Sequence, residues 1–387
     1  IKPLVKFGEG SSLCAGEKFK LLGCTKVLAG YDANINPAVV DAVIGSIEKE
    51  GIEVVRYACS YSDGKDDGVI ECRQLALDNK VDGFLAMGGG STMDIVKAAS
   101  LLVNVDLPEG AKSLVNYFVG HYNGPDLPRH AGLISIPTTA GTGAEATRSC
   151  IIASSALGVK ATLSSQAAKA DWVLLDPEMT VTLPKDMTGA TGLDAMAHAV
   201  EGYLKPEAHV YSDPLCLQSM KMVYENLYNA WLHPDDLEAR DNMLLASNIA
   251  MGGMADVGVQ IGHGIGQALG AYTHAAHGVT CAWALPYVVE HLCDTEAPKI
   301  REIAKAFGLQ LPEGASNVEV KDAVVGAIKD LSAAVELPMP RDLGFTMEKD
   351  YENFVKFVMR EQRLLQMSAR PVTEENVRAY MTDLLRR

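Results

Sequence analysis

The sequence has 387 residues, 48% of them hydrophobic, and a formal net charge of −15. A chain of this length and composition can bury a large core, and it predicts two domains or one unusually large one. The negative charge argues against nucleic acid as a partner, because a phosphate-binding surface needs clustered Lys and Arg side chains.

No run of about 18 apolar residues is present, so the sequence predicts no membrane span. The opening residues "IKPLVKFGEG" lack the apolar stretch of a signal peptide, and a cytoplasmic protein is therefore expected. The first residue is Ile rather than Met, which leaves open that leading residues or a processed segment are missing.

Eight cysteines, at positions 14, 24, 59, 72, 150, 216, 281 and 293, show no C-x-x-C spacing. Their spacing matches neither a disulfide framework nor a zinc site built from thiolates. They predict reduced thiols, about half of them buried as small core residues.

The first half of the chain alternates short apolar runs with helix-periodic stretches. Strands are expected at 26–31, 52–58 and 81–90, and helices at 35–51, 69–80 and 91–104. This order predicts βαβ units, and therefore a parallel sheet with helices on both faces.

From about residue 183 the segments become long and helix-periodic. Polar, Gly-rich or Pro-rich breaks between them are expected at 233–241, 251–258, 311–317 and 337–344. The sequence thus predicts an α/β domain over 1–183 followed by an all-helical domain over 184–387.

The stretch "FLAMGGGSTMDIVKAAS" runs from an apolar strand through three glycines, 88–90, into a helix. Ser91 and Asp94 have the spacing of a capping box, and a helix start approached by glycines can seat a phosphate. A tight strand-to-helix turn is the alternative reading. Met93 replaces the third glycine of the usual dinucleotide fingerprint, and no Walker A lysine follows.

A second polar loop, "SIPTTAGTGAEAT" at 135–147, follows another apolar strand. Its small hydroxyls, on Thr138, Thr139 and Thr142, suit contacts with phosphate, ribose or amide groups. Neither loop alone identifies a ligand.

Asp194 and His198 are four residues apart in the helix-periodic "TGLDAMAHAVEGYL", so both point from one face. The later stretch "QIGHGIGQALGAYTHAAHGVT" adds His263, His274 and His277. A carboxylate with imidazoles suits Zn²⁺ or Fe²⁺, whereas Ca²⁺ and Mg²⁺ prefer oxygen ligands. A solvated ion pair and ordinary core or surface histidines remain the alternatives.

Spacing does not choose between His274 and His277. They are three residues apart, so both would approach the same face if that stretch were helical.

Four motifs, "GGGSTMDIVKA", "PTTAGTGAEAT", "TGLDAMAHAVEGYL" and "HGIGQALGAYTHAAHGV", follow one another in this order. In order and spacing the sequence resembles the iron-dependent (group III) alcohol dehydrogenases, a superfamily that also holds glycerol dehydrogenase and dehydroquinate synthase. The resemblance extends from "FGEG" at 7–10 to "SARPVTEENV" at 368–377.

The resemblance implies a dinucleotide-binding domain over 1–183, a helical metal domain over 184–387 and an active-site cleft between them. By motif position, the implied metal ligands and catalytic residues are Asp194, His198, His263 and His277. His277 is preferred to His274 because Gly278 follows it, as in the family's His-Gly ligand.

The cofactor contacts are implied in the same way. Gly89, Gly90 and Ser91, with Asp94 in the same motif, resemble the pyrophosphate site. Thr138, Thr139, Thr142 and Lys160 resemble the contacts to the nicotinamide half of NAD. Asp32 resembles the acid that holds the adenosine ribose.

Three departures from the family pattern concern the substrate. Gln267 replaces the second histidine of the family's H-x-x-x-H, which puts proton relay at that position in doubt. Ser368, Ala369 and Arg370 replace the family's Asn-Pro-Arg on the substrate side. Arg148 and Ser149 stand where a smaller or uncharged pair is common. The candidate substrate contacts are Arg148, Ser149, Ile151, Met254, Asp256, Gln260 and Gln267.

The resemblance implies a hydride transfer between NAD(H) and a short-chain primary alcohol or aldehyde, and Arg148 adds the expectation of an anionic tail on the substrate. A cation held by three imidazoles and one carboxylate keeps positive charge and can polarise the substrate oxygen. Fe²⁺ is expected from the resemblance, and Zn²⁺ suits the same ligands.

Two alternatives stay within the superfamily: a glycerol dehydrogenase-like enzyme and a dehydroquinate synthase-like lyase that regenerates NAD in each turnover. A non-catalytic protein with a structural metal is disfavoured, because structural sites are usually thiolate-rich. The resemblance also implies a homo-oligomer, a dimer or larger. The expected partner is a small molecule, with neither nucleic acid nor a membrane.

Overall fold

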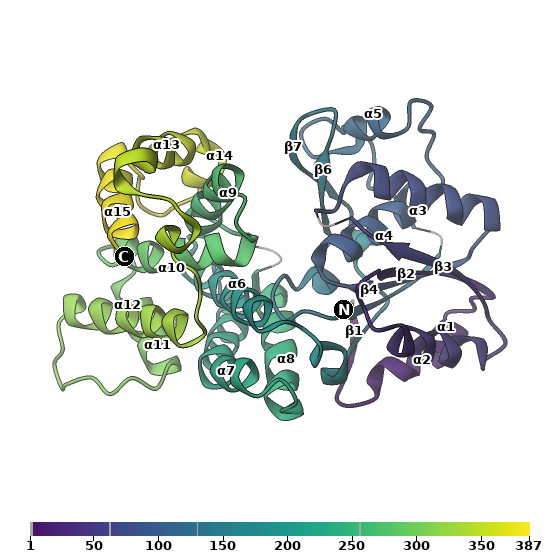
Figure 1. Ribbon diagram of the computed structural model, residues 1–387, viewed down its shortest axis with the longest axis horizontal. Helices are drawn as coiled ribbons and strands as arrows, with labels where there is room; N and C mark the ends of the chain where they lie inside the picture. Colours follow the sequence, from purple (N-terminus) through teal and green to yellow (C-terminus); the bar gives the residue numbers. More distant parts are fainter. Residues whose placement is uncertain (1–2, 62, 130, 255–256) are drawn as a thin grey trace. The chain divides into compact units, whose positions relative to one another are not determined.

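The computed structural model describes residues 3–61, 63–129, 131–254 and 257–387. Within it the chain forms two compact units, Ile1–Thr182 and Leu183–Arg387 (Figure 1). The boundary expected from sequence lies one residue further along the chain.

Unit 1 contains a parallel sheet of six strands in the order β1-β8-β5-β4-β2-β3. The strands are β1 (Leu4–Phe7), β2 (Lys26–Asp32), β3 (Glu53–Cys59), β4 (Gly83–Gly88), β5 (Gly132–Pro137) and β8 (Trp172–Leu175). The helices are α1 (Ala15–Leu21), α2 (Pro37–Glu48), α3 (Asp66–Asn79), α4 (Gly90–Leu102) and α5 (Ala111–Leu114). The predicted βαβ order and parallel sheet are confirmed.

Successive side chains along each strand point to opposite faces of this sheet, and both faces are covered by helices. Val27 and Ala29 of β2 point to one face, where they join a core with Phe19 of α1 and Ile44 of α2. On the other face α4 approaches so closely that a Cβ on Gly30 would lie 2.4 Å from a Val96 methyl carbon. Helices therefore cover both faces, as Figure 1 shows.

A second sheet in unit 1 was not expected from sequence. β6 (Ser149–Ser154) and β7 (Val159–Ser164) pair in an antiparallel hairpin next to the chain segment that follows β5. Its strands mix polar and apolar residues, so the period-2 signal there is weak.

In the part that the structure describes, unit 2 contains helices and no strand. Its helices are α6 (Lys185–Leu204), α7 (Ser212–Leu232), α8 (Leu237–Met254), α9 (Ile261–Thr273), α10 (His277–Leu292), α11 (Ala297–Ala306), α12 (Asn317–Ala334), α13 (Met347–Arg360), α14 (Gln362–Leu365) and α15 (Glu374–Arg386). Among the described helices, none has both the length and the apolarity to cross a membrane.

The break predicted at 251–258 starts too early, because α8 continues through Met254. Within this predicted break, Gly253 lies in the helix and allows close packing. A Cβ there would lie 2.9 Å from the Cys216 sulfur of α7, so glycine lets the two helices approach.

All eight cysteines are free thiols, and every one except Cys14 is buried. The expectation of reduced thiols holds. The expected share of buried cysteines, about half, was too low.

Candidate active site

Four side chains with metal-binding atoms converge in unit 2. They are Asp194 of α6, His263 of α9, and His277 and Cys281 of α10, and one ligand atom from each lies within 4.8 Å of the others. We call them the donor cluster. Asp194 Oδ1 is 3.7 Å from His263 Nε2 and 3.8 Å from His277 Nε2.

Glycines allow the three helices to meet at the donor cluster. A Cβ on Gly278 would lie 2.2 Å from the Ala190 carbonyl oxygen of α6, and one on Gly266 would lie 2.9 Å from the Cys281 sulfur. Any side chain at these positions would push α10 away from α6 or α9. Gly278, beside His277, is therefore explained by helix packing.

The donor cluster fits a cation. Asp194 and His263 are only 2% and 3% exposed. Their Oδ1 and Nε2 atoms are buried and have no hydrogen-bond partner among the described residues. Leaving buried polar atoms unpaired is costly, and a positive ion between them would satisfy both. The donor types, carboxylate, imidazole and thiol, are those of a Zn²⁺ or Fe²⁺ site.

His198 lies beside the donor cluster but is not one of its four residues. Its ring stacks on that of His263 with centroids 4.5 Å apart. Its Nδ1 atom is also buried without a hydrogen-bond partner among the described residues. Burial lowers the pKa of His198 to about 4, so the ring is neutral near pH 7, the form that binds metals. Its role as a ligand stays a prediction.

Glu201 orients His263, and sequence reasoning missed it. Glu201 Oε1 lies 2.5 Å from His263 Nδ1, and Oε2 accepts hydrogen bonds from the backbone N–H groups of Gln260 and His263. Burial alone would raise the pKa of Glu201, but His263 and these donors hold it below its usual value. The carboxylate therefore favours the tautomer whose Nε2 is free for a metal ion.

A signal for Glu201 was present in the sequence. It is three residues after His198 and seven after Asp194, which places all three on one face of α6. The spacing alone does not show that this carboxylate bonds to His263, which is 62 positions away in the chain.

His274 lies outside the donor cluster. The stretch 274–276 is not helical, because α9 ends at Thr273 and α10 begins at His277. His274 is exposed, with a left-handed backbone at φ 57°. The two histidines thus do not share a helix face.

In unit 1 the candidate cofactor residues gather at the carboxyl ends of three adjacent strands. Asp32 ends β2, Gly88 ends β4, and Thr138 follows β5. In parallel sheets ligands bind outside these ends. The Asp32 carboxylate accepts hydrogen bonds from the backbone and side-chain nitrogens of Asn34, 2.8 and 3.0 Å away, which fix its orientation.

The glycine loop (88–90) and the threonine loop (138–147) pack against each other. The Thr138 N–H donates to the Gly88 carbonyl oxygen at 3.0 Å. A Cβ on Gly90 would lie 3.0 Å from the Thr142 methyl carbon. Glycine at position 90 thus lets the two loops approach closely. The same absence of a side chain leaves the N-terminus of α4 open to an anion.

The predicted capping box at Ser91 and Asp94 is wrong. Helix α4 begins two residues earlier than that box requires, with Gly89 as its N-cap and no side-chain cap. The Asp94 carboxylate turns inward and accepts the N–H of Ile151 at 2.8 Å. Its described contacts, with Ile151 and with Lys97, give Asp94 a structural role within unit 1, and its contact with the cofactor stays a prediction.

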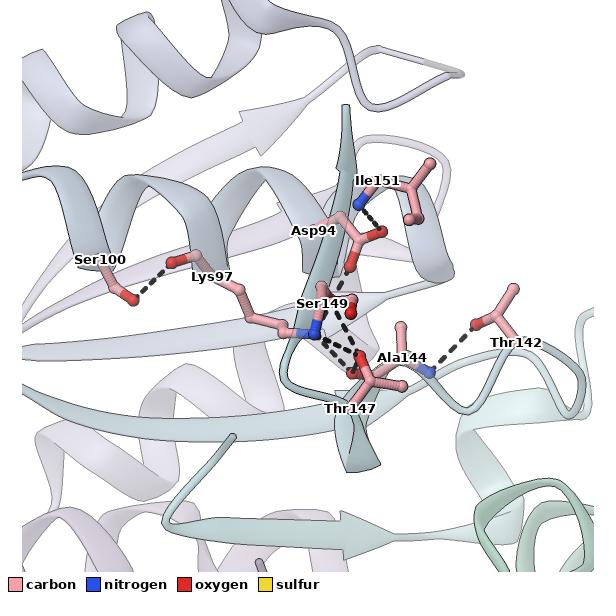
Figure 2. A network of polar contacts seen from close by, with 8 residues as sticks. All are labelled: Asp94, Lys97, Ser100, Thr142, Ala144, Thr147, Ser149 and Ile151. Atoms are coloured by element: carbon pink, nitrogen blue, oxygen red, sulfur yellow. Dashed lines mark hydrogen bonds and ion pairs between the residues drawn. The ribbon is translucent and has the colours of Figure 1, made fainter. Parts of the chain in front are cut away.

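Lys97 joins α4 to the end of the threonine loop, as Figure 2 shows. Its fully buried ammonium group donates to the carbonyl oxygens of Ala144 and Ser149 at 2.7 and 2.8 Å, and to the Thr147 hydroxyl at 3.1 Å. Asp94 lies 3.5 Å away as the counter-ion. This network fixes the start of β6 and the end of the threonine loop on one helix.

The other cofactor and substrate candidates are spread over both units. In unit 1, Lys160 is on β7 and pairs with Asp63 at 3.2 Å. Arg148 and Ile151 are exposed, and Ser149 opens β6.

In unit 2, Met254 and Gln260 are buried, Gln267 is exposed on α9, and Asp256 lies outside the described residues. The Gln260 side chain donates to the Glu201 carbonyl oxygen at 2.9 Å, which ties α9 to α6.

The expectation that Arg370 lies on the substrate side finds no support in its contacts. Its guanidinium donates to the His291 carbonyl oxygen at 3.0 Å and pairs with Asp294 at 3.2 Å. These bonds tie the segment before α15 to the end of α10.

Comparison with known proteins assigns both units to one protein family. The family model described as iron-containing alcohol dehydrogenase matches residues 3–177, and the model for the C-terminal part of the Fe-containing alcohol dehydrogenase family matches residues 188–385. The chain belongs to the iron-containing alcohol dehydrogenase family. This confirms the predicted family and class, an NAD-dependent alcohol dehydrogenase that contains a metal ion.

Individual relatives align with most of the chain. A choline dehydrogenase of Bacillus subtilis (strain 168) is 31% identical over 345 residues, which cover 89% of this chain and 84% of the relative. A sulfoacetaldehyde reductase of Bilophila wadsworthia is 31% identical over 335 residues, or 82% and 84% of the two chains. The crystal structure of a 1,3-propanediol oxidoreductase aligns with a TM-score of 0.88 at 26% identity and covers 99% of this chain and 98% of the other.

Proposed function

We propose that this dehydrogenase acts on short-chain primary alcohols and aldehydes, with its cation held by Asp194, His198, His263 and His277. The observation that carries the proposal is the pair of buried, unpartnered atoms, Asp194 Oδ1 and His263 Nε2. When bound, the cation supplies positive charge to the substrate oxygen and the nicotinamide ring supplies the hydride acceptor.

The chain's own residues prepare this chemistry. Glu201 holds the His263 ring so that no rotation is needed when the cation binds. Lys97 and the paired loops hold the amides and hydroxyls that receive the dinucleotide. Gln267 carries no titratable group, so substrate protons must exchange by another route.

Formation of NADH tests the reaction. An alcohol dehydrogenase releases one NADH for each alcohol oxidised, and we expect that ratio. A lyase of the dehydroquinate synthase kind regenerates NAD within each turnover, so it would show no net NADH. Glycerol as the best of a panel of alcohols would instead favour the glycerol dehydrogenase-like alternative.

We propose that Asp32 makes the enzyme prefer NAD to NADP. Its carboxylate can accept hydrogen bonds from the ribose hydroxyls, whereas the 2′-phosphate of NADP would bring like charges together. We expect kcat/KM to favour NAD by about tenfold or more, equivalent to about 1.4 kcal/mol. Asp32→Ser should reduce that ratio. Equal kcat/KM for the two cofactors in the wild type would contradict the role of Asp32.

We propose that Arg148 selects aldehydes with an anionic tail. It is exposed at the start of the β6–β7 hairpin, and a guanidinium can pair bidentately with a carboxylate or sulfonate. The name of the Bilophila wadsworthia relative, sulfoacetaldehyde reductase, supports this substrate class. We expect Arg148→Ala to raise KM for anionic aldehydes but not for neutral ones. Arg148→Lys keeps the charge and should show a smaller loss. Equal wild-type activity on both classes, unchanged by Arg148→Ala, would refute the proposal.

We propose that the chain forms a homodimer through β1. This strand ends the sheet and carries Leu4 and Phe7 at 50% and 59% exposure. The opposite edge, β3, carries two charged residues, Glu53 and Arg56, whereas β1 carries one, Lys6. We expect the wild type to sediment as a dimer and Phe7→Glu as a monomer. Leu21→Glu, at another exposed apolar position, is the control. A monomeric wild type would contradict the proposal.

We place the enzyme in the cytoplasm, because eight free thiols suit a reducing compartment.

A further inference from the structure

We propose that Cys281 is a ligand of the metal ion, so that the cation is bound by a thiolate in addition to carboxylate and imidazole groups. The inference rests on the metal role proposed above for Asp194, His263 and His277. It adds a donor of a different chemical kind.

The helix places Cys281 correctly for this role. His277 and Cys281 are four residues apart on α10, so their side chains point from the same face. The Cys281 sulfur is 3.5 Å from His277 Nε2. The residue is only 1% exposed, and its sulfur belongs to the donor cluster.

Packing keeps the thiol at the donor cluster. Gly266 faces it from α9, where a Cβ would lie 2.9 Å from the sulfur and 3.1 Å from the Cys281 backbone nitrogen. Gly278, one turn earlier, holds the start of α10 against α6. The sulfur is thus confined beside His263, three residues from Gly266 on α9.

The unpartnered atoms point to a ligand rather than to a lone cysteine in a core. Asp194 Oδ1 and His263 Nε2 are buried in the same cluster without hydrogen-bond partners among the described residues. Within the part of the chain that the structure describes, no other cysteine belongs to a group of three or more possible metal donors.

A thiolate changes which ion the site prefers. Zn²⁺ is commonly four-coordinate and binds sulfur well, and soft donors select it over harder ions. Cys281 thus adds a sulfur donor to the carboxylate of Asp194 and the imidazoles of His263 and His277. Coordination requires the thiolate, so the thiol proton is released to solvent when the ion binds.

Cobalt substitution tests this assignment without measuring activity. A cysteine ligand gives Co²⁺ a thiolate-to-metal charge-transfer band in the near ultraviolet, which imidazole and carboxylate ligands lack. We expect the band in the wild type, its loss in Cys281→Ser, and its retention in Cys293→Ser. Cys293 is the matched control, because it is a buried cysteine at the other end of α10 and its sulfur contacts the Asn317 carbonyl oxygen.

Zinc affinity gives a second readout. Loss of a residue that only supports a ligand lowers metal affinity by about 10- to 100-fold. We expect Cys281→Ser to lower Zn²⁺ affinity by at least that factor and to lower Fe²⁺ affinity less. An unchanged ratio of Zn²⁺ to Fe²⁺ affinity would count against the proposal.

X-ray absorption of the zinc-loaded wild type decides the matter even if Cys281→Ser does not fold. We expect one sulfur neighbour at about 2.3 Å from zinc. A zinc ion with only nitrogen and oxygen neighbours would overturn this inference and leave the proposed function intact. A wild-type protein that binds no metal stoichiometrically would overturn both.

Discussion

His277→Ala is expected to purify with little metal and to show no measurable turnover. The substitution removes a donor whose Nε2 lies 3.8 Å from Asp194 Oδ1, at the first residue of α10. Removing a ligand leaves an unfilled position on the ion, and the loss of affinity should exceed the roughly 10- to 100-fold effect of a supporting residue. Metal analysis after dialysis and a steady-state assay measure the two effects.

His274 supplies the matched control for that experiment. It is the nearest histidine in sequence, but it is the C-cap of α9 and lies outside the donor cluster. His274→Ala should keep its metal and some activity, and His274→Asn should keep more, because asparagine tolerates the left-handed backbone at φ 57°. A metal-free His274→Ala beside a metal-loaded His277→Ala would reverse the assignment.

Lys97→Met is expected to destabilise unit 1 severely. Lys97 is fully buried and Asp94 is 6% exposed, so the substitution would leave a buried carboxylate without its counter-ion. Breaking a buried ion pair from one side typically costs about 3–5 kcal/mol. Three hydrogen bonds to the threonine loop and β6 would also be lost. Thermal unfolding should show a lower Tm, and NAD(H) binding should weaken because the loop is no longer held.

Two further variants test whether the unpaired charge causes the loss of stability. Asp94→Asn in the Lys97→Met background should recover part of the lost stability, because it removes the unpaired charge. Lys80→Met, at an exposed site, should leave Tm nearly unchanged. If Lys97→Met unfolded at the wild-type temperature, the network would not hold the loop as described.

The sequence predicted the fold well where its pattern was strong. β4 is buried along its whole length, and its apolar run between turn signals could be read directly. The β6–β7 hairpin escaped prediction because its alternation is weak. The predicted capping box was wrong because residue spacing does not show which way a side chain points. The Asp94 carboxylate bonds to Ile151, which is 57 positions away in the chain.

Part of the candidate site was also within reach of the sequence. Asp194, His263 and His277 are brought together by the structure as their motifs suggested. Cys281 was not predicted, because an isolated cysteine has no motif. Only the packing of α10 against α9, at Gly266, shows where its sulfur lies. A motif position likewise does not reveal the bonds of Arg370 to His291 and Asp294.

Metal titration of chelator-treated protein tests the central claim most directly. Alcohol-dependent NADH formation should be absent from the metal-free enzyme and should rise with added Fe²⁺ or Zn²⁺ until one ion is bound per chain. The Asp194→Ala variant should neither bind that ion nor form NADH. Full activity in the metal-free protein, or stoichiometric metal binding by Asp194→Ala, would contradict the assignment of the active site to these residues.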